Sequence, residues 1–299
     1  MRRLIRTINF IAGHPLFAGG RKDALVMWLR WHLGLRITRQ PMVFDYVEGT
    51  RLIGRLGVRN SSAAYWVGLI ELDWTGFVLH YLRSEDVFYD VGANIGVFTI
   101  LAGIVRDADC VAFEPVPETF SFLQENIKLN CGCSRVELLN FGVGKEKGVL
   151  RFTSNEGATN HALAVGEQSD SNIELPIVSL DEVIVSRKSP TVLKVDVEGF
   201  EYEVLQGAKK LLDMPSLNVV MLELRNHGKR YGFNEDKIHK QMLDRGFTPV
   251  RYDPFERRFL TWNRESETKL GDVLYLKDIG LAEARVKDSS AFHVKDFDL

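Results

Sequence analysis

Residues 87–98 constrain the fold more than any other part of this 299-residue chain. They read Val-Phe-Tyr-Asp-Val-Gly-Ala-Asn-Ile-Gly-Val-Phe, an apolar run that is followed by a short glycine-containing turn and a second apolar stretch. The run 87–91 is typical of a buried strand, and 97–104 has the spacing of a helix. A strand, a tight turn and a helix N-terminus bring backbone N–H groups to the positive end of a helix dipole. The segment therefore predicts a ligand-binding turn in an α/β protein.

The spacing of the glycines narrows the choice of ligand. Gly92 and Gly96 flank Asn94 in a Gly-x-Asn-x-Gly pattern, whereas dinucleotide sites use Gly-x-Gly-x-x-Gly. Glycine allows the backbone to approach a ligand closely, because it carries no side chain. A pyrophosphate needs the longer loop, so the shorter one favours a nucleoside or the carboxylate of an amino acid.

A second strand ends in an acid shortly afterwards. Residues 110–114 form a short apolar run that finishes at Glu114, and a helix is expected at 118–130. In a doubly wound sheet, an acid at the end of the second strand reaches the ribose hydroxyls of a bound nucleoside. The turn and Glu114 together predict a nucleoside-cofactor site, with S-adenosylmethionine as the leading candidate. The alternative is an ordinary strand-turn-helix with a surface glutamate.

Strand and helix patterns alternate along most of the chain. Strands are expected at 43–47, 52–56, 87–91, 110–114, 136–141, 148–152, 174–178, 192–197, 218–224, 247–252 and 273–276. Helices are expected within 1–40 and at 61–82, 96–105, 118–130, 180–185, 201–212 and 236–245. This alternation implies a parallel sheet with helices on both faces, and ligands bind such sheets at the carboxyl ends of the strands. That rim is expected to carry Asp90, Glu114, Asn140, Asp196 and Glu223.

Four residues near this rim are candidates for catalysis. Asp196 and Glu198 lie two residues apart at a strand end, where their carboxylates can share one side and serve as a general base or orient a hydroxyl. Glu198 has the alternative role of capping the next helix. His161 lies in a polar loop and is a second candidate base, or else a solvent-exposed histidine. Glu223 either orients the substrate or acts as a capping group.

Three motifs in combination carry a resemblance to a known family. They are Asp90-Val91-Gly92-Ala93-Asn94-Ile95-Gly96, Phe113-Glu114-Pro115, and Lys194-Val195-Asp196-Val197-Glu198-Gly199 with Gly207-Ala208. Together they resemble the FkbM-type methyltransferases over roughly Val43 to Lys277. The resemblance implies an α/β, doubly wound, mostly parallel seven-stranded Rossmann-like sheet with an antiparallel last strand. It also implies S-adenosylmethionine as cofactor and O-methylation of sugars or polyketide-like products.

The resemblance also implies where the cofactor lies and how the chain is divided. The methionine part of the cofactor is expected to be surrounded by Asp90, Gly92, Asn94 and Gly96, with Glu114 at the ribose and Asn140 near the adenine. The catalytic domain is expected at 87–278, preceded by a helical and hairpin extension at 1–86 and followed by a tail at 279–299.

The sequence argues against nucleic acid as the acceptor and leaves oxygen as the acceptor atom. Amino-directed nucleic-acid methylases carry Asn/Asp-Pro-Pro-Tyr/Phe where this chain has residues 196–199, and no cysteine here follows a proline as in carbon-5 pyrimidine methylases. The net charge of −2 gives no overall attraction to nucleic acid. We expect O-methylation of a sugar, glycan or related small molecule. An oxidoreductase with a nucleotide cofactor and a non-catalytic S-adenosylmethionine-binding protein are the alternatives.

No metal ligand set is evident, since Cys131-x-Cys133 has no matching second pair for zinc. Three cysteines are an odd, sparse set that indicates reduced thiols and a cytoplasmic location.

Residues 1–40 carry eight Arg or Lys against one acid, so the remaining 259 residues of this −2 chain carry −9. This segment is expected to pack its Trp and Leu side chains as a lid on the catalytic domain. The alternative is that it lies on the inner face of the membrane, since it is basic and carries Trp28 and Trp31.

Overall fold

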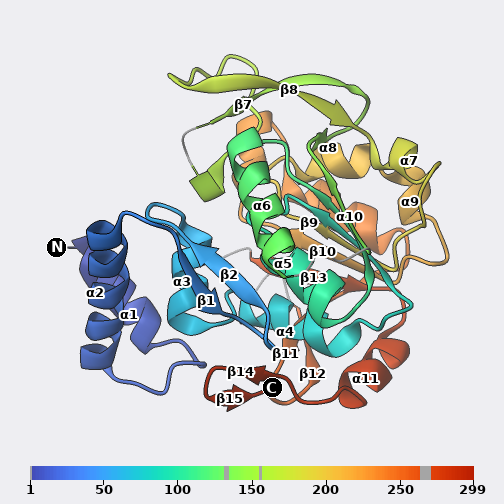
Figure 1. The fold of residues 1–299 in the computed structure, drawn as a ribbon. Helices are drawn as coiled ribbons and strands as arrows, with labels where there is room; N and C mark the ends of the chain where they lie inside the picture. The colour runs from blue at the N-terminus through green and yellow to red at the C-terminus, as the bar shows by residue number, and fades with distance from the viewer. Residues whose placement is uncertain (1, 131–134, 155–156, 263–270) are drawn as a thin grey trace.

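The computed structural model describes residues 2–130, 135–154, 157–262 and 271–299, so the Cys131-x-Cys133 pair lies outside the described residues. Its centre is a large sheet with the strand order β12-β11-β13-β10-β9-β3-β4-β5 (Figure 1). The strands are β3 (Val87–Val91), β4 (Asp109–Phe113), β5 (Val136–Leu139), β9 (Val192–Val195), β10 (Val219–Glu223), β11 (Thr248–Asp253), β12 (Arg258–Thr261) and β13 (Asp272–Leu276).

The sheet is mostly parallel, as the sequence predicts. Strands β5, β4, β3, β9 and β10 pair in parallel, and β13 lies antiparallel between β10 and β11. The predicted count of seven strands is wrong by one, because β12 adds an antiparallel eighth strand beyond β11. The sequence pattern missed β12 because it is a short edge strand with mostly exposed side chains.

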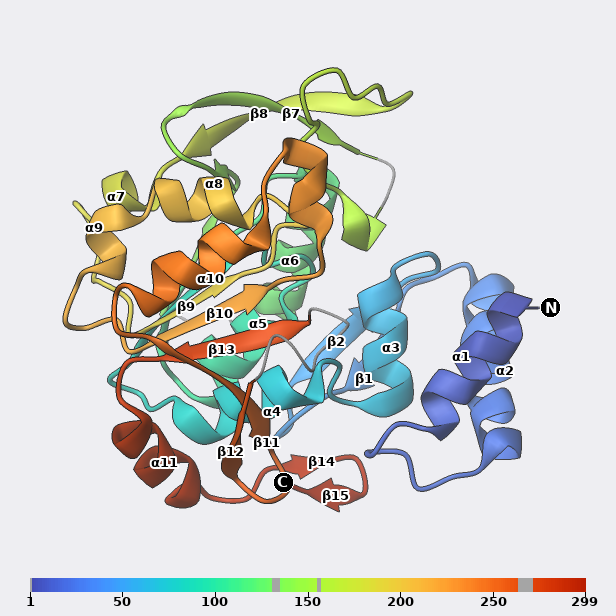
Figure 2. The same cartoon turned by 180° about the vertical axis from the view of Figure 1, so that it is seen from behind.

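Helices cover both faces of the sheet and bury alternate residues of each strand. One face packs against α4 (Leu72–Tyr81), α5 (Val97–Ile100), its π-helical continuation η1 (Leu101–Val105), α6 (Pro117–Leu129) and α11 (Ile279–Lys287). The other face packs against α7 (Leu180–Val183), α8 (Glu201–Gln206), α9 (Lys209–Leu212) and α10 (Glu235–Leu243). In Figure 2, α10 lies alongside β9 and β10. In β3, Phe88 joins the first core while Tyr89 joins the second, as the period of two requires.

A small second sheet has the order β6-β8-β7. It consists of β6 (Gly142–Val143), β7 (Gly148–Thr153) and β8 (Asn172–Val178), and it confirms the predicted hairpin between 148–152 and 174–178. The loop between β7 and β8 contains the short helix η2 (Gly157–Thr159).

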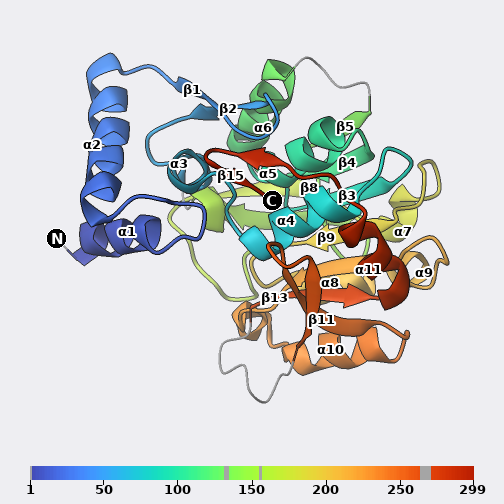
Figure 3. The same cartoon turned by 90° about the horizontal axis from the view of Figure 1, so that it is seen from below.

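The N-terminal segment packs as a layer beside the main sheet. It contains α1 (Arg2–Ala12), α2 (Arg21–Thr38), the predicted hairpin β1 (Met42–Asp45) and β2 (Arg51–Gly54), and α3 (Arg59–Val67). Figures 1 and 3 show α1 and α2 at one side of the molecule, next to α3. Trp31 of α2 is 1% exposed, and its ring lies so close to Gly54 that a Cβ there would be 2.4 Å from it.

Two helices expected to be continuous are interrupted. The stretch 61–82 forms α3 and α4 because the backbone turns left-handed at Gly68, with φ of +76°, and at Glu71, with φ of +50°. The stretch 201–212 forms α8 and α9, which meet at Gly207. A Cβ at Gly207 would lie 2.1 Å from the carbonyl oxygen of Gly144, so the chain needs glycine there.

The C-terminal tail packs onto the rest of the chain. It contains α11 and the hairpin β14 (His293–Val294) and β15 (Phe297–Asp298), and Val294 forms a bridge with Val47. Leu16, Phe88 and Val294 belong to one hydrophobic core, so the expected boundaries at 86 and 278 do not separate independent cores. Among the helices of the described residues, none has the length and apolar character needed to cross a bilayer.

Candidate functional site

A pocket lies at the carboxyl ends of β3, β4, β9 and β10. It contains about 900 Å³ of empty space, a volume that includes the part open to solvent. The structure brings together seven of the candidates identified in the sequence on its wall: Gly92, Asn94, Glu114, His161, Asp196, Glu198 and Glu223. Three other candidates, Asp90, Gly96 and Asn140, are not among the lining residues. The carboxyl edge of the sheet is therefore hollowed where the sequence predicts a ligand.

The glycine turn does not present the open row of backbone N–H groups that the sequence predicted. All five amides of residues 92–96 donate within the protein. Their acceptors are Phe113 O for Gly92 and Ala93, Glu114 Oε2 for Asn94, Asn94 Oδ1 for Ile95, and Ala93 O for Gly96. These hydrogen bonds fix the turn against the end of β4, and the expectation of free N–H donors is wrong in this conformation.

The two glycines are required by protein neighbours. Gly92 has a φ of +81°, and a Cβ there would lie 1.9 Å from the carbonyl oxygen of Asp196. Gly96 has a φ of +92°, and its Cβ would lie 2.5 Å from Cδ1 of Leu123 in α6. Gly92 therefore allows the ends of β3 and β9 to meet at the pocket.

Glu114 is a buried carboxylate at the end of β4. It is 6% exposed, and its two oxygens accept hydrogen bonds from the backbone N–H groups of Val116, at 3.0 Å, and Asn94, at 3.1 Å. Burial raises the pKa of Glu114 to about 7. Each carboxylate oxygen keeps a second lone pair, so Glu114 has the capacity to accept two more hydrogen bonds from a ligand.

Asn140 supports the segment that carries Glu114. Its side-chain amide donates to the carbonyl oxygens of Glu114 and Pro115, both at 2.8 Å. Asn140 therefore positions the end of β4 from outside the pocket wall.

Asp90 and Lys194 form a buried ion pair beneath the pocket. Asp90 is fully buried, accepts a hydrogen bond from Thr99 at 2.7 Å, and lies 3.2 Å from Nζ of Lys194. Lys194 also lies 3.4 Å from Oδ2 of Asp196. Burial opposes the charged form of Lys194, but the carboxylates of Asp90 and Asp196 raise its pKa above the usual range. Asp90 is thus connected to the pocket through Lys194, for which the sequence alone indicates no role.

His161 is buried, and both ring nitrogens face acceptors. Nδ1 lies 3.1 Å from the carbonyl oxygen of Thr159, and Nε2 lies 3.2 Å from Oε1 of Glu167. This arrangement does not fit the base role suggested from the sequence, and the alternative of a solvent-exposed histidine is also wrong, since His161 is 4% exposed.

Carboxylates are concentrated on the wall formed by β9 and β10. Burial, and then the negative charge of Asp196, raise the pKa values of Glu198 and Glu223. His227, the first residue of η3 (His227–Tyr231), places Nδ1 at 3.2 Å from Oε2 of Glu198. No role for His227 follows from the sequence, although this residue lies four residues beyond the end of β10.

Other wall residues were not identified in the sequence. Arg59, Asn60 and Glu71 reach the pocket from α3 and the break before α4. Burial raises the pKa of Glu71 to about 8, with a further contribution from Asp196. Arg225 lies 2.9 Å from Oε1 of Glu223. Glycine is unfavourable within a helix, so Gly68 is the sequence signal for the break between α3 and α4. This break brings Glu71 to the wall of the pocket.

Comparison with known proteins decides the family. The model of the methyltransferase FkbM domain matches residues 90–249. The chain belongs to the FkbM methyltransferase family. The match begins near the end of β3 and contains the glycine turn, Glu114 and the acidic wall at β9 and β10.

Two relatives show how far the similarity to other FkbM-family members extends. The hexuronic acid methyltransferase AglP of Haloferax volcanii is 35% identical over 156 residues, covering 52% of this chain and 62% of AglP. The 31-O-demethyl-FK506 methyltransferase FkbM of Streptomyces tacrolimicus is 30% identical over 202 residues, covering 56% of this chain and 75% of that protein. A solved FkbM methyltransferase structure from Methylobacillus flagellatus gives a TM-score of 0.43 at 15% identity, covering 92% of this chain and 59% of that one.

Proposed function

We propose that this chain is an S-adenosylmethionine-dependent O-methyltransferase that acts on a hydroxyl of a sugar or glycan. The observation that carries the proposal is one pocket in which the buried Glu114 and the carboxylate of Asp196 line the wall together. This arrangement suits a nucleoside at β4 and an acceptor at β9. When bound, S-adenosylmethionine supplies a methyl group on a positively charged sulfur.

The cofactor end of the pocket is formed by the end of β4 and the residues after it. The free lone pairs of Glu114 accept hydrogen bonds from the two ribose hydroxyls, each such bond to a charged group contributing about 1.5–3 kcal/mol. Val116 and Phe141 line the same region and offer apolar surface to the adenine.

The acceptor end is formed by Asp196 and its neighbours. Asp196 accepts the proton of the acceptor hydroxyl, or holds the hydroxyl in line with the methyl group. Lys194 fixes the position of Asp196 through the contact at 3.4 Å. Asp90 pairs with Lys194 and holds its side chain in place. Asp90 therefore contributes to catalysis without touching the ligands.

A groove leads from this end of the pocket to the N-terminal helices. It shares Arg59, Asn60 and Glu71 with the pocket and continues along a surface lined by Arg6, Thr7, Phe10, His14, Ala63, Trp66 and Ile70. Aromatic side chains and arginines together suit a sugar that carries a carboxylate. The similarity to a hexuronic acid methyltransferase supports an acidic sugar as the acceptor.

The outer face of α2 is a proposed contact with the inner face of the membrane. Its exposed apolar side chains lie on one side of the helix, with exposed fractions from 38% to 78%, and are Leu25, Val26, Leu29, Leu33 and Ile37. Lys22 and Arg36 belong to the same helix, and such a face suits an anionic lipid surface. Trp31 takes no part, because it is buried against the protein.

The proposed reaction is tested by detecting S-adenosylhomocysteine as the co-product across a panel of glycans that includes uronic acids. We expect co-product formation with at least one acidic sugar, and mass spectrometry should show one added methyl group on its oxygen. Asp196→Asn is expected to lower turnover by about 10²–10⁴-fold while S-adenosylmethionine affinity changes little. Turnover within a few-fold of the parent would contradict the role of Asp196.

A further inference from the structure

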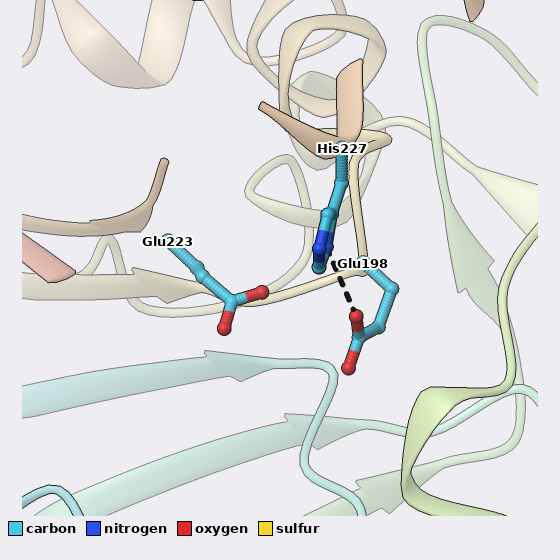
Figure 4. A group of neighbouring side chains, drawn as sticks. All are labelled: Glu198, Glu223 and His227. Carbon is cyan, nitrogen blue, oxygen red and sulfur yellow. Dashed lines mark ion pairs between the residues drawn. The ribbon is translucent and has the colours of Figure 1, made fainter. Parts of the chain in front are cut away.

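Three side chains converge at the wall of the pocket where β9 and β10 end. One ligand atom each from Glu198, Glu223 and His227 lies within 4.8 Å of the other two. Figure 4 shows the two carboxylates and the imidazole ring turned toward a common space. An imidazole nitrogen with two carboxylates is a donor set that divalent transition-metal ions bind.

Glu223 gives independent support for a ligand in this space. It is 5% exposed, and its Oε1 is paired with Arg225 at 2.9 Å. Its Oε2 is buried and has no hydrogen-bond partner among the described residues. A buried carboxylate oxygen that has lost water without gaining a partner is unfavourable, so such atoms call for an explanation.

The two positively charged side chains near Glu223, those of Lys194 and Arg225, already contact other carboxylates. Lys194 contacts Asp90 and Asp196, and Arg225 contacts Asp272 at 2.9 Å as well as Oε1 of Glu223. Neither provides a partner for Oε2 of Glu223. A bound cation would supply that partner and bridge Glu223 to Glu198.

The local backbone brings the third ligand into place. Glu198 has a left-handed backbone with a φ of +56°, and Gly199 follows with a φ of +106°. A Cβ at Gly199 would lie 2.7 Å from the carbonyl carbon of His227, so glycine is needed for the two loops to pack together. This packing holds Nδ1 of His227 at 3.2 Å from Oε2 of Glu198.

We propose that Glu198, Glu223 and His227 bind a divalent cation such as Mn²⁺ at the acceptor end of the pocket. The effect of this cation on catalysis rests on the proposed O-methylation, whereas binding of the cation does not depend on that function. A hydroxyl on this ion loses its proton to Asp196 more readily. The resulting oxygen forms its bond to the methyl carbon as the methyl–sulfur bond breaks, leaving the neutral thioether of S-adenosylhomocysteine.

Binding of Mn²⁺ to the full chain, followed by electron paramagnetic resonance of the free ion, tests this site without turnover. We expect one site in the parent and at least tenfold weaker binding in His227→Ala and Glu223→Gln. The matched control is His293→Ala, since His293 pairs with Asp298 at 3.0 Å on an exposed hairpin. That variant should bind Mn²⁺ as the parent does. Because His227 is partly exposed, its replacement is expected to leave the fold intact, which circular dichroism checks.

Two results would overturn the cation site. One is the absence of Mn²⁺ binding by the parent at millimolar concentration, and the other is parent-like binding by both ligand variants. S-adenosylmethionine affinity measured on the same preparations distinguishes this failure from failure of the proposed function. Intact cofactor binding without Mn²⁺ binding overturns the cation site alone, whereas Mn²⁺ binding that depends on His227 and Glu223 supports the site even without cofactor binding.

Discussion

Glu114 combines burial with two backbone hydrogen bonds, and both features affect its chemistry. Burial favours the neutral acid, while the N–H groups of Val116 and Asn94 favour the carboxylate. The balance leaves its pKa at about 7, above the usual value for glutamate. The charge state of the proposed ribose-binding group therefore changes near neutral pH.

The affinity for S-adenosylmethionine is expected to fall as pH decreases through about 7. The reason is that a proton on Glu114 occupies one of the lone pairs needed by the ribose hydroxyls. Below this pH the affinity contributed by Glu114 falls by up to about tenfold per pH unit. Calorimetric titrations from pH 5.5 to 8.5 provide the measurement.

Glu114→Gln controls for groups on the ligand that titrate in the same range. The difference in S-adenosylmethionine affinity between the parent and Glu114→Gln should disappear toward low pH. A constant difference across the whole range would show that Glu114 does not titrate there.

At the residue scale, the sequence predicted positions better than roles. Of the five residues expected at the rim, Glu114, Asp196 and Glu223 line the pocket, whereas Asp90 and Asn140 do not. Glu198, expected beside Asp196, also lines it. The sequence did not show that Asp90 is paired with Lys194, since the partners are about a hundred residues apart in the chain and meet only across neighbouring strands. Similarly, the acceptors on both nitrogens of His161 depend on how its loop folds.

The glycine turn after β3 shows how an element can be predicted correctly for an incomplete reason. Its strand, turn and helix are where the pattern indicated, and the two glycines are essential to its shape. Its amides nevertheless donate within the protein, and Gly92 faces the carbonyl of Asp196. The close approach of β9 involves a distant part of the chain, which a local pattern does not reveal.

Gly92→Ala is expected to lower the free energy of unfolding by roughly 3 kcal/mol or more, because it adds a steric clash to an unfavourable φ. Gly57→Ala is the matched control, since Gly57 has a similar φ of +86° but open space where its Cβ would lie. That change should cost about 1 kcal/mol from backbone strain alone. Urea unfolding measures both variants, and equal losses would contradict the close packing of β3 against β9.

The remaining elements were predictable where their patterns were long and buried. The parallel strands and α6 fall within a few residues of their expected limits. The break between α3 and α4 was missed because the stretch is apolar on both sides of Gly68, and this break brings Glu71 to the pocket. The edge strand β12 is not evident from the sequence, because most of its side chains are exposed. It is held in the sheet by antiparallel pairing with β11.

The whole molecule presents a basic N-terminal layer next to an acidic pocket. Residues 1–40 carry +7 within a chain of net charge −2. The buried face of α2 packs on α3, and its outer face remains exposed. Packing and the proposed membrane contact therefore use opposite sides of the same helix.

The chain is expected to sediment with vesicles of phosphatidylglycerol at low salt but not with vesicles of phosphatidylcholine. Each basic residue near an anionic surface contributes about 1 kcal/mol, and added salt should release the protein. Leu33→Glu should weaken sedimentation, because Leu33 is 51% exposed on the outer face of α2. Val185→Glu, at an 85% exposed position after α7, should have no effect. Absence of sedimentation at low salt would leave the N-terminal helices as a packing layer alone.

Calorimetric titration of the full chain with S-adenosylmethionine and, separately, with NAD⁺ identifies the ligand of the pocket. We predict one S-adenosylmethionine per chain and no measurable binding of NAD⁺. Glu114→Ala should reduce the S-adenosylmethionine affinity by at least tenfold, since it removes two hydrogen bonds to a charged group. Glu118→Ala, an exposed change four residues away, should leave it unchanged. Tighter binding of NAD⁺, or S-adenosylmethionine binding unaffected by Glu114→Ala, would show that Glu114 does not hold the ribose of S-adenosylmethionine in this pocket.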